Sequence, residues 1–159
     1  MTTISLPRRT VPSVGSALAV IHEGWMRQVV TFLGPALNED ADFWSRWAGA
    51  RFLTDQFGDR FRVECAFVDA LGRLLAPETV RCLAAAREAV ERTGREMVAA
   101  GRRRDTRLPA AHLAHRFIDQ LALWCVEVEL ATARIPPTAL PAPAHRLLDR
   151  LWLADALSR

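Results

Sequence analysis

Apolar and polar positions alternate along the chain with the period of an α-helix. In residues 14–32 the apolar side chains recur at three- and four-residue steps, which places them on one side of a helix. Ser13 is a suitable cap before this helix, and Gly34-Pro35 is a suitable end. Prolines within residues 1–12 oppose helix formation, so that segment is expected to be an extended tail.

A second, longer helical pattern runs from about residue 38 to residue 75. Asn38 and Asp40 are candidate caps at its start. One unbroken helix of this length would measure roughly 55 Å at about 1.5 Å per residue, which is long for a small domain. Gly49 and Gly58 lower helix stability, so either glycine could mark a bend or a break.

Three further helices follow. Residues 76–101 begin with Pro at the first helical position and carry a thin apolar stripe beside a face of oppositely charged pairs, which is typical of a solvated surface helix. Residues 109–134 are rich in apolar positions, and residues 144–157 form a short amphipathic pattern. The four prolines within residues 135–143 predict an extended, polyproline-like connector.

These patterns predict an all-α fold. No segment alternates apolar and polar residues as a half-buried strand does, and no internal repeat is present. Short connections favour antiparallel neighbours, so we expect an antiparallel up-down bundle of four main helices with a short C-terminal helix. The expected organisation is a tail (1–12), a helical bundle (13–134), a Pro-rich linker (135–143) and a C-terminal amphipathic helix (144–159).

The composition is that of one soluble globular domain. Half of the 159 residues are hydrophobic and a quarter are charged, and we expect neither a membrane span nor a secretory signal. All 21 basic side chains are arginine, which indicates a GC-rich, bacterial genome. Cys65, Cys82 and Cys125 are far apart and are interpreted as small core residues in a reducing cytoplasm.

Residues 43–64 hold six of the twelve aromatic residues, interleaved with arginines. Helical spacing places most of these rings on one stripe, which favours packing in the core. The alternative is a small-molecule pocket with Glu64 as its polar group and aromatic walls formed by Trp25, Trp47, Phe57, Phe61 and Trp124.

Glu64 lies at the edge of the apolar stripe, where a carboxylate requires a partner. Arg60, one turn earlier, is the simplest partner. The alternative is a buried polar site between helices, whose candidate members are Arg46, Arg60, Glu64 and Glu127. Glu127 and Glu129 are otherwise expected at an exposed helix edge.

The helix at residues 109–134 is apolar on two opposite faces. Leu123, Val126 and Leu130 lie on the second face, which predicts either a central helix or an interface with another chain. We favour self-association as a homodimer. The C-terminal helix caps the bundle or docks on a neighbouring chain, and its candidate interface residues are Leu148, Leu151 and Trp152.

No catalytic motif is recognisable, and lysine-based covalent chemistry is excluded because lysine is absent. His22, Glu64 and His115 could form a metal site, but the histidines are expected at the surface or at helix caps. We expect no metal and no cofactor. One basic cluster stands out as a candidate phosphate-binding loop and contains Arg102, Arg103, Arg104 and Arg107.

The leading hypothesis is therefore a non-enzymatic, cytoplasmic helical module for protein interaction or regulation. The net charge of only +3 makes the electrostatic argument for nucleic-acid binding weak. Two alternatives remain: a nucleic-acid-binding subunit that uses the arginine loop, and a small-molecule-binding bundle with an aromatic pocket.

Overall fold

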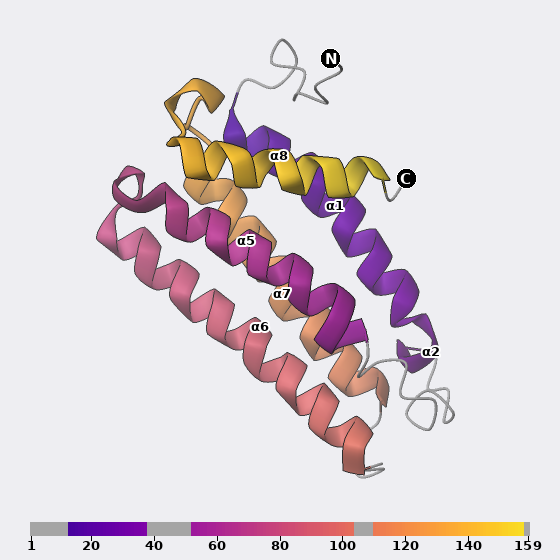
Figure 1. The fold of residues 1–159 in the computed structure, drawn as a ribbon. Helices are drawn as coiled ribbons and strands as arrows, with labels where there is room; N and C mark the ends of the chain where they lie inside the picture. Colours follow the sequence, from indigo (N-terminus) through magenta and orange to yellow (C-terminus); the bar gives the residue numbers. More distant parts are fainter. Residues whose placement is uncertain (1–12, 38–51, 104–109, 158–159) are drawn as a thin grey trace.

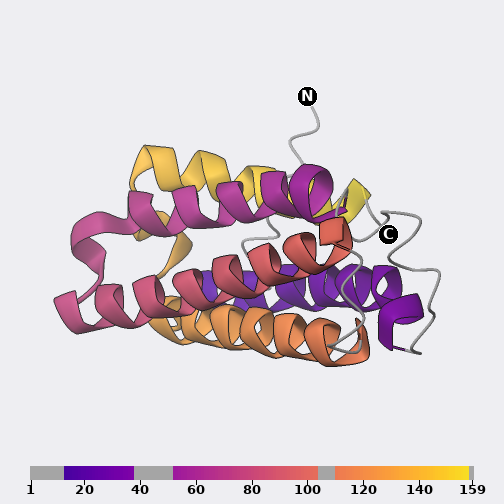
Figure 2. The same cartoon turned by 90° about the horizontal axis from the view of Figure 1, so that it is seen from below.

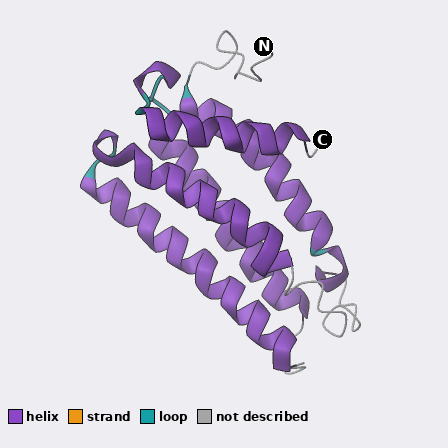
Figure 3. Ribbon diagram, viewed as in Figure 1, coloured by secondary structure: helices purple, strands orange, loops and turns teal. Residues whose placement is uncertain are grey.

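The computed structural model describes residues 13–37, 52–103 and 110–157. Every regular element within these ranges is helical, which confirms the all-α prediction (Figure 3). In chain order the elements are α1 (Val14–Phe32), α2 (Gly34–Leu37), the π-helical turn η1 (Phe52–Phe57), α5 (Gly58–Leu71), the 3-10 turn η2 (Gly72–Leu74), α6 (Pro77–Arg103), α7 (Ala110–Thr132), the 3-10 turn η3 (Pro137–Ala139) and α8 (Ala142–Leu157).

The start of α1 follows the sequence prediction. Ser13 has extended backbone angles, and its side-chain oxygen accepts a hydrogen bond from the Ser16 backbone N–H at 3.1 Å. The next residue, Val14, donates its backbone N–H to the Ile135 carbonyl oxygen at 2.8 Å. The first turn of α1 is thus tied to the segment that follows α7.

The long helix predicted up to residue 75 ends earlier in the structure. Gly58 does not interrupt it, because the π-helical turn η1 leads directly into α5. Gly72 ends α5 with a φ of +49°, a left-handed conformation that glycine adopts without a side-chain clash. Gly49 and the predicted caps Asn38 and Asp40 lie outside the described residues.

The Pro-rich linker also differs from its prediction. Residues 137–139 form a 3-10 turn instead of continuing an extended polyproline connector, and α8 already begins at Ala142. Pro143 therefore lies in the first turn of the helix, where a missing backbone N–H costs no hydrogen bond.

The long helices pack around one core. α6 and α1 lie along α7, while α5 lies against α8 (Figure 1). Seen from below, α5 and α8 form a layer above α1 and α7 (Figure 2). The largest fully buried side chains come from α1 and its C-cap residue, α5, α6, α7 and α8. They include Leu18, Leu33, Phe67, Leu71, Met97, Phe117, Trp124 and Leu151.

In the described ranges, none of the helices combines the length and the apolar character that crossing a bilayer would require.

Helices α1 and α7 approach each other closely at Gly15. A Cβ atom at this position would lie 2.7 Å from the Glu129 carbonyl oxygen and 2.8 Å from the Ala133 Cα. Both are backbone atoms, the first in α7 and the second in the turn directly after it, and they cannot rotate away as a side chain could. The absence of a side chain at Gly15 therefore sets the spacing of the two helices at this end of the bundle.

We expect the Gly15→Ala variant to lose about 1–3 kcal/mol of unfolding free energy because the added methyl group forces α1 and α7 apart. Alanine is otherwise the better helix former, so a loss of stability identifies the steric clash. Urea unfolding gives the measurement. Gly34→Ala is the matched control, since a Cβ there meets nothing within 4 Å and stability should stay equal or rise. Equal behaviour of the two variants would contradict the close approach.

Candidate functional site

A histidine from α1 joins α5 and α7 in the interior of the bundle. His22 is only 2% exposed, and its Nε2 atom is hydrogen-bonded to Oε1 of the fully buried Glu64 on α5. Its Nδ1 atom lies 2.8 Å from Oε2 of the half-buried Glu129 on α7. Both ring nitrogens thus face carboxylate oxygens that come from two different helices.

The two carboxylates hold His22 in its charged form. Burial by itself lowers the pKa of His22, but the negative charge of Glu64 and hydrogen bonding with Cys125, Glu129 and Glu64 outweigh that effect. The pKa of His22 is therefore raised well above its ordinary value of 6.5. The imidazolium donates both N–H groups, one to each carboxylate, and compensates their charge within the core.

Arg60 of α5 lies beside this group, and part of its guanidinium has no hydrogen-bond partner among the residues described. Its guanidinium carbon is 5.1 Å from the centroid of the Trp25 ring, which is a cation–π contact. Within the described part of the chain, Arg60 Nε and Nη2 and Glu64 Oε2 are buried and have no hydrogen-bond partner. Burial lowers the pKa of Arg60, although the charges of Glu64, Asp155 and Cys125 act in the opposite direction.

The aromatic side chains form a continuous stack next to the charged cluster. Phe57 stacks on Trp25 at 5.5 Å between ring centroids and on Phe61 at 5.6 Å. Phe61 meets Trp124 edge to face at 5.3 Å. All four rings are buried, so they pack mainly against one another. Trp47 of the predicted pocket lies outside the described residues.

The predicted polar site is only partly assembled from its expected members. Arg60 and Glu64 lie together, Glu127 is half-buried on α7, and Arg46 is outside the described residues. Glu129 reaches Glu64 through His22, so the expectation that Glu129 is an exposed edge residue and that His22 is a surface residue is wrong.

One signal in the sequence points to His22. It directly follows Ile21 and precedes Trp25 by three residues, and both are buried members of the α1 stripe. A histidine beside this stripe faces the interior. The partner from α7 has no comparable signal, because helical spacing says nothing about which turn of a distant helix lies opposite.

The metal hypothesis is not supported by the positions of its members. His115 is exposed on α7, whereas His22 and Glu64 are buried. Within the described residues, no group of three or more His, Cys, Asp or Glu side chains is arranged to hold a metal ion.

The candidate interface residues of α8 lie against the core of their own chain. Leu148 and Leu151 of α8 are buried in this core, so they are not available as an interface, and Trp152 is half-buried against it.

The candidate phosphate-binding loop stays a prediction. Arg102 and Arg103 end α6, whereas Arg104 and Arg107 lie outside the described residues. Cys82 is exposed, which corrects its interpretation as a core residue.

The other two cysteines are buried, as expected for small core residues. Burial raises the pKa of Cys65 to about 12 and keeps its thiol protonated at neutral pH. The buried cluster around His22 is likewise closed to solvent, which suits a structural role better than contact with a substrate.

Folding stability should depend on the charge of His22. Since its folded pKa lies above the unfolded value, its contribution is complete below about pH 6.5 and is lost as the pH rises through the folded pKa. The unfolding free energy should therefore fall from pH 6 towards alkaline pH. We expect His22→Gln to cost about 3–5 kcal/mol at pH 6, because it leaves the Glu64 charge buried and uncompensated.

His145→Gln is the control, since the half-exposed His145 pairs with Asp149 on the surface of α8, where solvent screens the pair, and its variant should lose less than about 1 kcal/mol at pH 6. The measurements are urea unfolding across the pH range and NMR titration of the ring signals of His22 in the wild-type protein. A ring that titrates at or below pH 6.5 would show that the imidazole is not held charged.

No protein-family model matches this chain, and neither a curated protein nor a solved structure shows significant similarity to it. The buried cluster, the cavities and the exposed faces of the helices are therefore the observations from which its function is inferred.

Proposed function

We propose that this protein is a non-catalytic interaction or regulatory module that works as a homodimer through the outer face of α7. Leu123, Val126 and Leu130 carry this proposal, because they are 53%, 50% and 68% exposed. Their spacing places them in one line along the helix. Contiguous exposed apolar side chains on a small protein are typical of an interaction surface.

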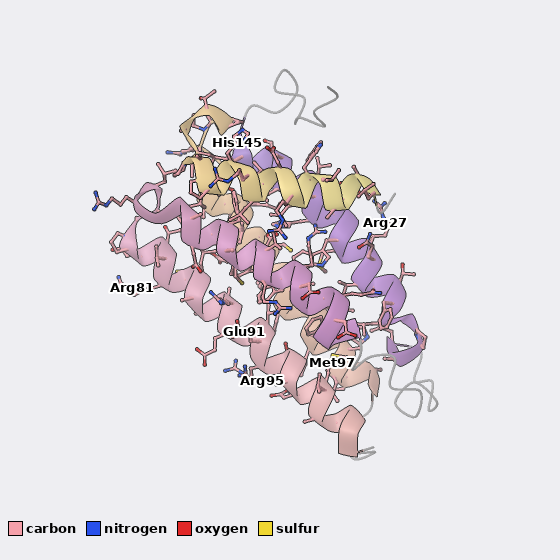
Figure 4. The ribbon with its side chains drawn as sticks, viewed as in Figure 1. Arg27, Arg81, Glu91, Arg95, Met97 and His145 are labelled. Atoms are coloured by element: carbon pink, nitrogen blue, oxygen red, sulfur yellow. The ribbon has the colours of Figure 1, made fainter. Side chains whose placement is uncertain are left out.

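The outer face of α7 contrasts with that of its neighbour α6. On α6, the residues Arg81, Glu91 and Arg95 point away from the bundle, as expected for a helix in contact with water (Figure 4). On α7, the inward face already buries Leu121, Trp124 and Val128. The second apolar line on α7 is therefore additional to what the core requires.

The sequence of this face suits an antiparallel pairing of two α7 helices around a two-fold axis. If the axis passes beside Val126, midway between residues 126 and 127, Leu123 of one copy meets Leu130 of the other, and the interface is self-complementary. The same register brings Asp119 towards the turn that follows α7 in the second copy, where Arg134 lies. Both residues are exposed and carry opposite charges, so the pairing supplies two equivalent ion pairs at the rim.

Contacts with α1 make α7 a rigid support for this face. Glu129 precedes Leu130, and its carboxylate is hydrogen-bonded to His22 while its carbonyl lies against Gly15. The exposed leucine thus extends from a turn whose neighbouring residue is fixed. A preorganised face loses little conformational entropy on association.

We place this module in the bacterial cytoplasm as part of the same proposal. Cys65, Cys82 and Cys125 are free thiols, which supports a reducing compartment. The use of arginine for all 21 basic residues supports a GC-rich bacterial source.

Light scattering coupled to gel filtration tests the homodimer. We expect the wild-type chain to have twice its 17.7 kDa mass at micromolar concentration, and Leu123→Glu/Leu130→Glu to be monomeric because charges would be buried at the interface. Leu74→Glu is the matched control: this leucine is 43% exposed in η2 and does not belong to the outer face of α7, so its variant should stay dimeric. A wild-type monomer at high micromolar concentration would overturn the proposal.

A charge exchange tests the antiparallel register. Asp119→Arg should weaken the dimer about three- to tenfold, because it places like charges opposite each other, and adding Arg134→Asp should restore it. Sedimentation equilibrium measures the dissociation constants. A double variant as weak as Asp119→Arg alone would exclude this register while leaving the leucine face to be judged by the preceding experiment.

A further inference from the structure

A cavity of about 450 Å³ lies between α1, the start of α5 and α8. Its volume is within the range of about 300–1,000 Å³ that is typical of small-molecule sites. The cavity is separate from the outer face of α7, since α7 contributes none of the described residues that line it. The apolar part of its wall is formed by Trp25, Phe57, Val63, Leu151, Leu153 and Leu157.

The polar part of the wall carries an excess of positive charge. Arg60 and Arg150 line the cavity together with Asp59, Gln28 and Gln56. Asp59 is already engaged by an ion pair with the exposed Arg62. Two guanidinium groups therefore face the cavity with one carboxylate, which has its own partner.

Arg60 is the group on this wall whose guanidinium lacks hydrogen-bond acceptors among the described residues. Its Nε and Nη2 atoms, which form one edge of the guanidinium, are buried and have no hydrogen-bond partner in the described structure. Trp25 supports the flat side of the guanidinium at 5.1 Å. A buried, unpaired donor loses its hydration without gaining a partner, which is unfavourable and calls for an acceptor from elsewhere.

The neighbouring carboxylates do not supply that acceptor. Glu64 Oε1 is bonded to His22, and Glu64 Oε2 has no hydrogen-bond partner among the described residues. Glu64 and Asp155 stabilise the charge of Arg60, but neither accepts a hydrogen bond from its Nε or Nη2 atom. Arg60 lines the cavity, but its unpaired edge is buried, so an incoming group reaches that edge only if the guanidinium turns toward the cavity.

We propose that this cavity binds a small amphipathic carboxylate, whose apolar body contacts Trp25, Phe57 and Leu151 and whose carboxylate pairs with Arg60. A planar carboxylate matches the planar guanidinium, and their charge-assisted hydrogen bonds are stronger than neutral ones. The apolar lining excludes strongly hydrated small anions, because they would lose water without gaining apolar contacts. A medium-chain fatty acid or an arylalkyl acid has the required combination.

Binding of decanoate, measured by titration calorimetry below its micelle-forming concentration, tests this site. Decanol and decyltrimethylammonium have the same apolar chain with a neutral and a positive head group. We expect decanoate to bind at least about tenfold more tightly than decanol, because only the carboxylate pairs with a desolvated cation. We expect decyltrimethylammonium to bind more weakly than decanol.

Two variants of the lining separate the charge from the apolar body. Arg60→Met keeps an apolar stem of similar length, so it should remove the preference for decanoate and retain decanol binding, which also shows that the cavity is intact. Val63→Trp should fill the cavity and abolish binding of both compounds. Arg150→Met is the control for a guanidinium at the exposed rim, and its decanoate affinity should change by less than about threefold because solvent screens its charge.

Several outcomes would overturn the proposal. Decanoate that binds no more tightly than decanol, or no binding of either compound to the wild-type chain, would show that the site does not take a carboxylate. Undiminished decanoate binding by Arg60→Met or Val63→Trp would place the ligand elsewhere. None of these results depends on whether the chain is a dimer.

Discussion

The placement of His22 between two carboxylates is the interaction on which the arrangement of the bundle depends. Taking three ionisable groups out of water is unfavourable, and their mutual attraction offsets this only if the geometry is good. Because it needs good geometry, the cluster favours one arrangement of the helices over others. Apolar stripes on α1, α5 and α7 could slide by a turn with modest loss of contact, but only one register brings Glu64 to Nε2 and Glu129 to Nδ1 of the same ring. The close approach of α1 and α7 at Gly15 acts in the same direction.

The sequence predicts the elements well because helices are specified locally. The Ser13 cap, the apolar period of α1 and the proline at the start of α6 are each readable from a few neighbouring residues. Gly72 illustrates the limit: a glycine ends a helix only if the chain adopts a positive φ there, and that depends on where α6 must pack. The turn at residues 137–139 has the same origin, since it brings α8 onto α5.

Of the cluster around His22, only Glu64 could be identified from the sequence as a carboxylate that needs a partner. Glu64 is recognisable as a carboxylate at an apolar edge, and its buried position follows from the period of its own helix. Its partner is not a neighbour at i,i−4 but a histidine 42 positions earlier, and the histidine's second partner is 107 positions later. Pairings over such separations are set by the packing of whole helices, which no single periodicity encodes. Local spacing favours Arg60, one turn from Glu64, as the partner of this carboxylate. The packing of the helices supplies His22 as its hydrogen-bond partner instead.

The two halves of the polar interior differ in a way that bears on function. His22 donates to carboxylates on both sides and is compensated within the chain, whereas Arg60 has an aromatic ring beneath it and no acceptor for its buried edge. Polar networks inside proteins specify structure when they are complete and are unfavourable when they are not. Arg60 borders a cavity, whereas His22 lies in the closed core with both ring nitrogens hydrogen-bonded. A buried donor without a partner is tolerable where an outside group can supply the acceptor, which is the reason for proposing that Arg60 takes part in binding.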